Sequence, residues 1–200
     1  LWTWGRNSEF QLGYSSSDEK NSYLNKLMDD VASVALGTNF SAAVKKNGEL
    51  WTWGWNYKGV VGNEGGTDGF APAKLMDDVV SVSLGYLHVA AIKRDGSLWM
   101  WGDNSHGELG NGTTNDSGNY MPVKIMDNVV AVSLGIGDDA DNPGYSAAIK
   151  RDGSLWMWGD NSHGQFGNGT TEGSTVPVKV MDGVSSVSLG LAHAGVIMQD

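Results

Sequence analysis

Four side chains with oxygen ligands lie close together in one segment, and they are the strongest candidates for metal chemistry. Asp138, Asp139, Asp141 and Asn142 fall within five positions of the segment Ile136–Gly144. Carboxylate and amide oxygens are ligands that Ca²⁺ prefers, but this spacing does not match an EF-hand loop. The sequence therefore favours a solvated polar loop that contacts a partner over a Ca²⁺ site, and it predicts no cofactor.

The histidines offer a second kind of chemistry, because imidazole serves both as a metal ligand and as a general base. His88 and His193 occupy matching positions in two similar segments, and Phe40 and Tyr145 hold that position in two others. Exchange for phenylalanine or tyrosine indicates a packing or turn role. The chain also has no Ser/His/Asp signature and no phosphate-binding loop, so no catalytic residue is predicted.

Tryptophan pairs recur along the chain and offer a platform for sugars. The phrase Leu-Trp-x-Trp-Gly begins at Leu1, Leu50, Leu98 and Leu155, with spacings of 49, 48 and 57 residues. Both rings of a pair face the same side, because alternate residues of a strand share a face. Residues that recur once per repeat usually serve folding and stacking, so packing between repeats is favoured over sugar binding.

Composition narrows the function classes. The 200 residues include 29 Gly, nine Trp and no Cys, and the formal net charge is −10. An acidic chain repels the phosphate backbone of nucleic acids, so no nucleic-acid partner is predicted. No apolar run approaches the length of a membrane span, so no membrane insertion is predicted. The chain starts with Leu1 rather than Met, and we expect a processed product or an excised piece.

The clearest repeat unit contains four short apolar segments separated by turn signals. Asp-Gly between the second and third segments is a strong hairpin signal. A polar, glycine-rich loop is expected from Asp103 to Tyr120. Four short strands per repeat of this length describe one blade of a β-propeller. The strands are expected at Val79–Gly85, His88–Lys93, Leu98–Gly102 and Pro122–Met126.

The whole chain divides into similar units, which predicts an all-β fold with four four-stranded blades. We interpret residues 1–200 as a single repeat domain. Its repeats are expected to span approximately residues 1–49, 50–97, 98–154 and 155–200.

One longer motif points to a known family. The segments 102–113 and 159–170 read Gly-Asp-Asn-Ser-His-Gly, two residues, Gly-Asn-Gly-Thr. With the strand pattern before them, they closely resemble the regulator of chromosome condensation (RCC1) repeat. The resemblance covers the whole chain and implies a propeller, usually of seven blades. The Leu-Trp-x-Trp-Gly variant resembles the bacterial branch, which implies an extracellular or cell-surface location, with the cytoplasm as the alternative.

The number and phase of the repeats leave two architectures open. The chain has four repeats, begins on a third strand at Leu1, and stops after a second strand at Val196–Met198. It is expected to form part of a larger ring, cut out or completed by a homodimer. The alternative is that four blades close alone. Open edge strands at both ends favour the first architecture.

Partner contacts are expected on the face of the propeller that carries its long loops, because binding residues concentrate on loops displayed by rigid scaffolds. Trp55 stands out, since it lies outside the repeated tryptophan pairs. The residues expected to contact a partner are Trp55, Asn56, Tyr57, Asp68, Phe70, Asn115, Tyr120, Asp138, Asp139, Asp141 and Asn142.

The leading functional prediction is a non-enzymatic scaffold for protein–protein interaction, with a partner of unknown identity. The resemblance leaves a guanine-nucleotide exchange factor for a small GTPase and an inhibitor of an extracellular enzyme as alternatives. A carbohydrate-binding protein and a truncated or designed repeat protein are further alternatives. The family includes a plant ultraviolet receptor, but the matching positions Thr38–Phe40, Tyr86–His88 and Leu191–His193 contain no tryptophan, which argues against photoreception.

Overall fold

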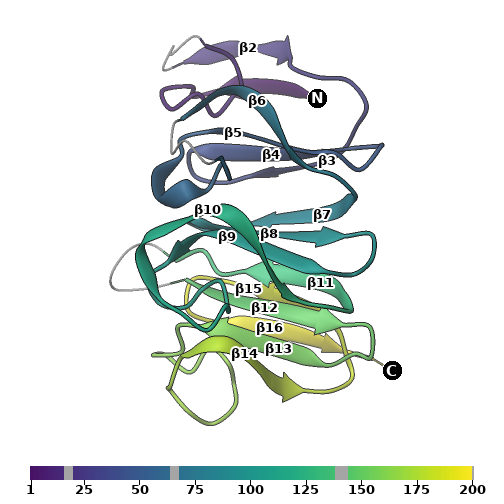
Figure 1. Ribbon diagram of the computed structural model, residues 1–200, viewed down its shortest axis with the longest axis vertical. Helices are drawn as coiled ribbons and strands as arrows, with labels where there is room; N and C mark the ends of the chain where they lie inside the picture. The colour runs from purple at the N-terminus through teal and green to yellow at the C-terminus, as the bar shows by residue number, and fades with distance from the viewer. Residues whose placement is uncertain (16–19, 64–67, 138–143, 200) are drawn as a thin grey trace.

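The regular structure is built from antiparallel strands, as the repeat pattern predicts. The computed structural model describes residues 1–15, 20–63, 68–137 and 144–199. Three four-stranded sheets lie beside one another along the long axis of the molecule (Figure 1). They contain β3 (Val31–Leu36), β4 (Phe40–Lys45), β5 (Leu50–Gly54) and β6 (Gly69–Met76); β7 (Val79–Leu84), β8 (His88–Lys93), β9 (Leu98–Asn104) and β10 (Asn115–Met126); and β11 (Val129–Leu134), β12 (Tyr145–Lys150), β13 (Leu155–Gly159) and β14 (Ser174–Met181).

Each sheet is a meander whose central hairpin closes on an Asn-Gly or Asp-Gly turn. Gly48, Gly96 and Gly153 have φ angles of +90°, +85° and +79°, a region that favours glycine. The first strand of each sheet packs against the first and second strands of the preceding sheet: β7 against β3 and β4, and β11 against β7 and β8. This arrangement of successive four-stranded sheets confirms the predicted propeller blades.

The outer strands begin earlier than the sequence indicated. The segment from Asp103 to Tyr120 was expected to be a loop, but β9 continues to Asn104 and β10 starts at Asn115. Asn115 pairs with Asn104, and Asn119 pairs with Gly102, with irregular register between the pairs. The backbone groups of the longer β9 find partners in this way, although the proline near the middle of β10 lacks an N–H.

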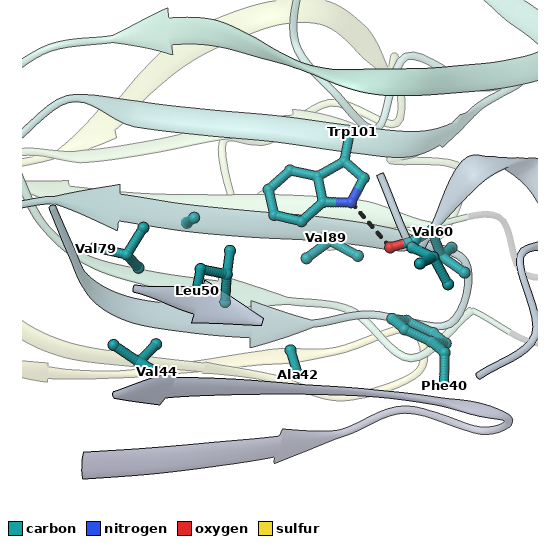
Figure 2. Packing of buried hydrophobic residues seen from close by; sticks show 10 residues of the cluster. Phe40, Ala42, Val44, Leu50, Val60, Val79, Val89 and Trp101 are labelled. Atoms are coloured by element: carbon teal, nitrogen blue, oxygen red, sulfur yellow. Dashed lines mark hydrogen bonds between the residues drawn. The ribbon is translucent and has the colours of Figure 1, made fainter. Parts of the chain in front are cut away.

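Large side chains fill the spaces between neighbouring blades. Trp53, Trp101 and Trp158 are fully buried, and their indole Nε1–H groups donate hydrogen bonds of 2.9, 2.9 and 2.7 Å to backbone carbonyls of the preceding repeat. Figure 2 shows Trp101 among apolar residues of two adjacent sheets, with its bond to Val60. These contacts confirm packing between blades for the second tryptophan of the pairs in the second, third and fourth repeats. Trp4, which has no preceding blade in the chain, is 59% exposed.

Two half-blades flank the complete blades. β1 (Trp2–Gly5) pairs with β2 (Asn21–Lys26), and β15 (Val184–Leu189) pairs with β16 (Ala194–Met198). These are separate two-stranded sheets, and no pairing joins one to the other among the described residues. Figure 1 shows β2 at one end of the long axis and β15 and β16 near the sheet β11–β14. The described strands form an open arc, so the four repeats do not close a ring within this chain.

Candidate functional site

The loop after β5 differs in chemistry from the matching loops of the other repeats. Trp55 follows the strand glycine at a place where Arg6, Asp103 and Asp160 stand elsewhere. Tyr57 replaces a serine that is found in each of the other repeats. Lys58 replaces glutamate or histidine. Two aromatic rings are therefore specific to this loop, as is a lysine at the position of Lys58, whereas the loop geometry is shared.

A buried asparagine sets that shared geometry. The Asn56 side-chain oxygen accepts a hydrogen bond of 2.9 Å from the Val61 N–H, and its amide donates to Asn63 at 2.8 Å. Bonds of the first kind recur at Asn7, Asn104 and Asn161, which are also buried. Asn56 was predicted to contact a partner. Its side chain is only 3% exposed and organises the loop, so it has little surface to offer.

The aromatic side chains of the loop form a stack. The Trp55 and Tyr57 rings lie 4.8 Å apart between centroids and are inclined by 10°. Tyr57 begins the 3₁₀ turn η1 (Tyr57–Gly59), in which Lys58 has a φ of +59°. Tyr57 is 47% exposed, while Trp55 is half-buried. The stack therefore presents an aromatic surface to solvent.

The outer strand of the next blade supplies the opposite wall. A Cβ on Gly59 would lie 2.8 Å from Cα of Tyr120, and one on Gly118 would lie in severe overlap with the carbonyl of Lys58. The η1 turn thus packs on the β10 backbone at distances that only glycine permits. This close approach places Tyr120, 37% exposed, next to the loop that carries Tyr57.

These elements enclose an open groove of about 470 Å³ between the second and third repeats. It combines three aromatic rings with one acid, one cation and two small polar side chains. We call it the aromatic groove, and it is lined by Trp55, Asn56, Tyr57, Lys58, Asp68, Ser117 and Tyr120.

The two charged residues of the aromatic groove have different partners. The Lys58 ammonium lies 3.5 Å from an Asp103 carboxylate oxygen and donates to Ser105 at 3.5 Å, across the blade boundary. The Asp68 carboxylate accepts a 2.9 Å hydrogen bond from the Asn56 N–H. Among the described residues, no lysine or arginine forms an ion pair with Asp68.

The structure therefore brings together five of the predicted contact residues and separates others. Trp55, Asn56, Tyr57, Asp68 and Tyr120 line the aromatic groove. Four other predicted contact residues belong to the insertion and lie outside the described residues: Asp138, Asp139, Asp141 and Asn142. Any Ca²⁺ site that they would form lies outside the described residues as well.

Phe70 and Asn115 do not line the groove. Both were expected in loops, but they lie on the outer strands β6 and β10. The Phe70 ring packs edge-on against Phe10 of the preceding repeat, with centroids 4.6 Å apart. The Asn115 amide donates to the carbonyl of Gly118 at 3.0 Å, within its own strand.

Sequence reasoning missed Lys58 and Ser117 as lining residues. The departure of Lys58 from glutamate and histidine in matching loops was a usable signal. Ser117 had no signal, because a serine in a polar segment is unremarkable, and only the packing of η1 on β10 brings it to the groove.

A second group of titratable side chains lies buried beside the third repeat. Burial is the main cause that lowers the pKa of His88 to about 4 and raises the pKa of Glu108 above its usual value. Glu108 accepts a 2.8 Å hydrogen bond from the His106 N–H. Gln165 holds the matching position in the next repeat and accepts the same bond at 2.9 Å. A glutamine performs this role equally well, so we interpret Glu108 as a structural residue.

Other classes of site find little support in the described part of the chain. Its His, Asp and Glu side chains form no group of three that could hold a metal ion. Helices with the length and hydropathy to cross a bilayer are also absent from that part.

The chain is similar to proteins built from one repeat type. It matches the regulator of chromosome condensation (RCC1) repeat at residues 1–44, 47–92, 95–138 and 152–197. A second description of the same repeat matches residues 31–60 and 79–108. Protein RCC2 homolog of Danio rerio is 36% identical over 73 residues, which cover 34% of this chain and 14% of that protein. The ultraviolet-B receptor UVR8 of Arabidopsis thaliana is 27% identical over 206 aligned positions, covering 99% of this chain and 35% of the receptor.

Solved structures support the fold. Prp20p from Saccharomyces cerevisiae, whose binding to Gsp1p and histones has been described, superposes with a TM-score of 0.80 at 21% identity. The match covers all of this chain and 52% of Prp20p. Human WBSCR16 gives a TM-score of 0.63 at 20% identity, with coverage of 100% and 67%. Measured by length, the matches to the two curated relatives cover 14% and 35% of those proteins, about a third or less.

Proposed function

This chain belongs to the regulator of chromosome condensation (RCC1) repeat family, and we propose that it is a non-enzymatic scaffold that binds a partner protein through the aromatic groove. The observation that carries the proposal is the stack of half-buried Trp55 and exposed Tyr57 on one loop, where the other repeats have polar residues. Tryptophan and tyrosine are enriched among the residues that dominate binding energy at protein interfaces.

The position of the groove supports the proposal. It spans two blades, and its walls are held by buried side chains and by close backbone packing at Gly59 and Gly118. Residues that are fixed before binding lose little conformational entropy when a partner arrives. A relative, Prp20p, is described with two kinds of protein partner, Gsp1p and histones, which adds support for protein binding as the general role.

The experiment is a capture of partners from the organism that encodes the chain. The double variant Trp55→Asp/Tyr57→Ser introduces the residues that the third and fourth repeats have at the matching positions. We therefore expect the variant to fold. The control variant Lys124→Ser/Asp127→Ser removes an exposed ion pair at the opposite face. Proteins that are enriched by the wild type and the control but lost with the groove variant would support the proposal. Equal enrichment by all three would refute it.

We further propose that copies of this chain associate through their half-blades. Trp2, Trp4, Ile197 and Met198 on these half-blades are between 48% and 65% exposed, which is apolar surface that a further blade would cover. Light scattering after size exclusion should give about twice the 21.3 kDa chain mass. A monomer at all concentrations would contradict association and would leave further repeats of a longer chain as the covering element.

The proposed location is extracellular or at the cell surface, and the support is the resemblance of the Leu-Trp-x-Trp-Gly repeats to the bacterial branch. Fractionation of the source cells, with antibody detection in medium, envelope and cytoplasm, tests this. Guanine-nucleotide exchange is the rival function, and a nucleotide-release assay on small GTPases of the same source would reveal it.

A further inference from the structure

Charge is distributed unevenly between the two faces of the propeller. At the end of the molecule that carries the short turns, the described turns and adjoining strand ends contain ten cations and nine acids. Their charges nearly balance. The opposite, long-loop face has three described cations, Arg6, Lys20 and Lys58. Its described loops carry six acids, of which Glu108 is buried: Glu9, Asp68, Asp103, Glu108, Asp160 and Glu172.

The aromatic groove therefore opens on the acidic side of the molecule. Its one cation, Lys58, is matched by Asp103 at 3.5 Å, and its ammonium lies 5.8 Å from the centroid of the Tyr57 ring. Its one acid, Asp68, has no such counter-charge among the described lysines and arginines. The unmatched charge of the groove is thus negative, and it lies in the same groove as the exposed ring of Tyr57.

An arginine side chain fits these two features together. Its planar guanidinium stacks on an aromatic face and donates paired hydrogen bonds to a carboxylate. Acidic surroundings also draw a cationic segment toward the groove and increase its rate of association. An acidic segment would meet repulsion from the same face.

We propose that the aromatic groove binds an arginine-bearing basic segment of the partner protein, with a guanidinium stacked on Tyr57 and paired with Asp68. The inference rests on the proposed function and specifies the chemistry of the partner at that site. A saccharide is the competing occupant, since sugars also stack on aromatic rings, but it would not require the Asp68 charge.

The test uses labelled peptides and fluorescence anisotropy on the full chain. The probe is a short peptide of arginines spaced by glycine and serine. The matched probe replaces each arginine with citrulline, which keeps the shape and removes the charge. We expect the citrulline peptide to bind at least about tenfold more weakly, as expected for loss of a charge-assisted hydrogen bond. Equal binding of the two peptides, or no binding of either, would overturn the inference.

Variants locate the binding. Asp68→Asn and Tyr57→Ser should each weaken the arginine peptide about tenfold. Glu172→Gln removes the same charge from an exposed position on the same face and should change the affinity less than twofold, because exposed distant charges are screened. Equal losses for Asp68→Asn and Glu172→Gln would mean a general field effect and would overturn the site, as would competition by an uncharged oligosaccharide. Circular dichroism confirms that each variant is folded.

Failure of this inference can be told apart from failure of the proposed function. If the peptides show no dependence on arginine while the Trp55→Asp/Tyr57→Ser variant still loses partners in the capture experiment, the groove binds protein by other chemistry. If capture does not depend on the groove, the proposed function fails as well.

Discussion

The indole Nε1–H of Trp101 donates a 2.9 Å hydrogen bond to the backbone carbonyl of Val60, which lies 41 residues earlier in the preceding repeat. The same relationship joins Trp53 to Gln11 and Trp158 to Glu108. Each bond ties the third strand of one blade to the loop that follows the third strand of the preceding blade. In the second repeat, that loop also carries Trp55 and Tyr57, so blade stacking and groove geometry depend on one another.

Replacing Trp101 with phenylalanine should destabilise the chain by about 1–3 kcal/mol, because the buried Val60 carbonyl loses its partner. The measurement is urea unfolding followed by circular dichroism. Trp4→Phe is the matched control, since Trp4 is 59% exposed, and its effect should stay within about 0.5 kcal/mol. Similar losses for both variants would contradict a specific role for the bond.

Replacing Glu108 with glutamine should stabilise the chain at neutral pH. Burial raises the pKa of Glu108, so its contribution to stability is fully present below its unfolded pKa and is lost as the pH rises through the folded pKa. Glutamine avoids the buried charge, and Gln165 shows that its amide can donate to the matching Asp160 at 2.7 Å.

Unfolding midpoints measured from pH 4 to pH 8 check this prediction. The advantage of Glu108→Gln should shrink toward acidic pH as the wild-type carboxyl becomes protonated. The reciprocal variant Gln165→Glu should be less stable than the wild type at neutral pH. A constant difference between wild type and Glu108→Gln across the range would show that the buried charge is not the cause.

His88 should make the chain sensitive to acid. Burial lowers its pKa from 6.5 to about 4, so the unfolded chain takes up a proton more readily than the folded chain. Its stability contribution is present above pH 6.5 and is lost as the pH falls through the folded value, by at most about 3 kcal/mol. In His88→Phe, which copies Phe40 of the preceding blade, this loss should disappear. Unfolding free energies at pH 7 and pH 4.5 for both proteins provide the comparison.

The Phe10–Phe70 contact should contribute to stability rather than to partner binding. Edge-to-face rings at this distance contribute about 0.5–1.5 kcal/mol beyond their buried area. A double-mutant cycle of Phe10→Ala and Phe70→Ala should recover that coupling energy in urea unfolding. Phe10 has a φ of +59°, where the other repeats have glycine. Phe10→Ala and Phe10→Gly both lack the ring, so the difference between them separates the backbone strain from the ring contact.

Much of this molecule follows from its sequence. The spacing of Leu-Trp-x-Trp-Gly and the Asn-Gly and Asp-Gly turns specify the order of strands within each blade, because turn chemistry and alternation are local properties. Trp55 was visible in the sequence as a tryptophan outside the repeated pairs, and Tyr57 was expected beside it as a contact residue. The tertiary structure then showed them stacked in a shared groove.

Contacts between repeats could not be predicted from these local sequence signals. The early start of β10 at Asn115 depends on backbone pairing with β9, which side-chain patterns do not record. The aromatic groove exists because η1 packs on β10, so that Tyr57 and Tyr120, 63 residues apart in the sequence, line the same groove. Phe70 and Tyr120 were both expected to contact a partner, but Phe70 packs edge-on against Phe10 and does not line the groove. Sequence determined each blade because its signals are local, and only the tertiary structure decided which surfaces the blades leave open.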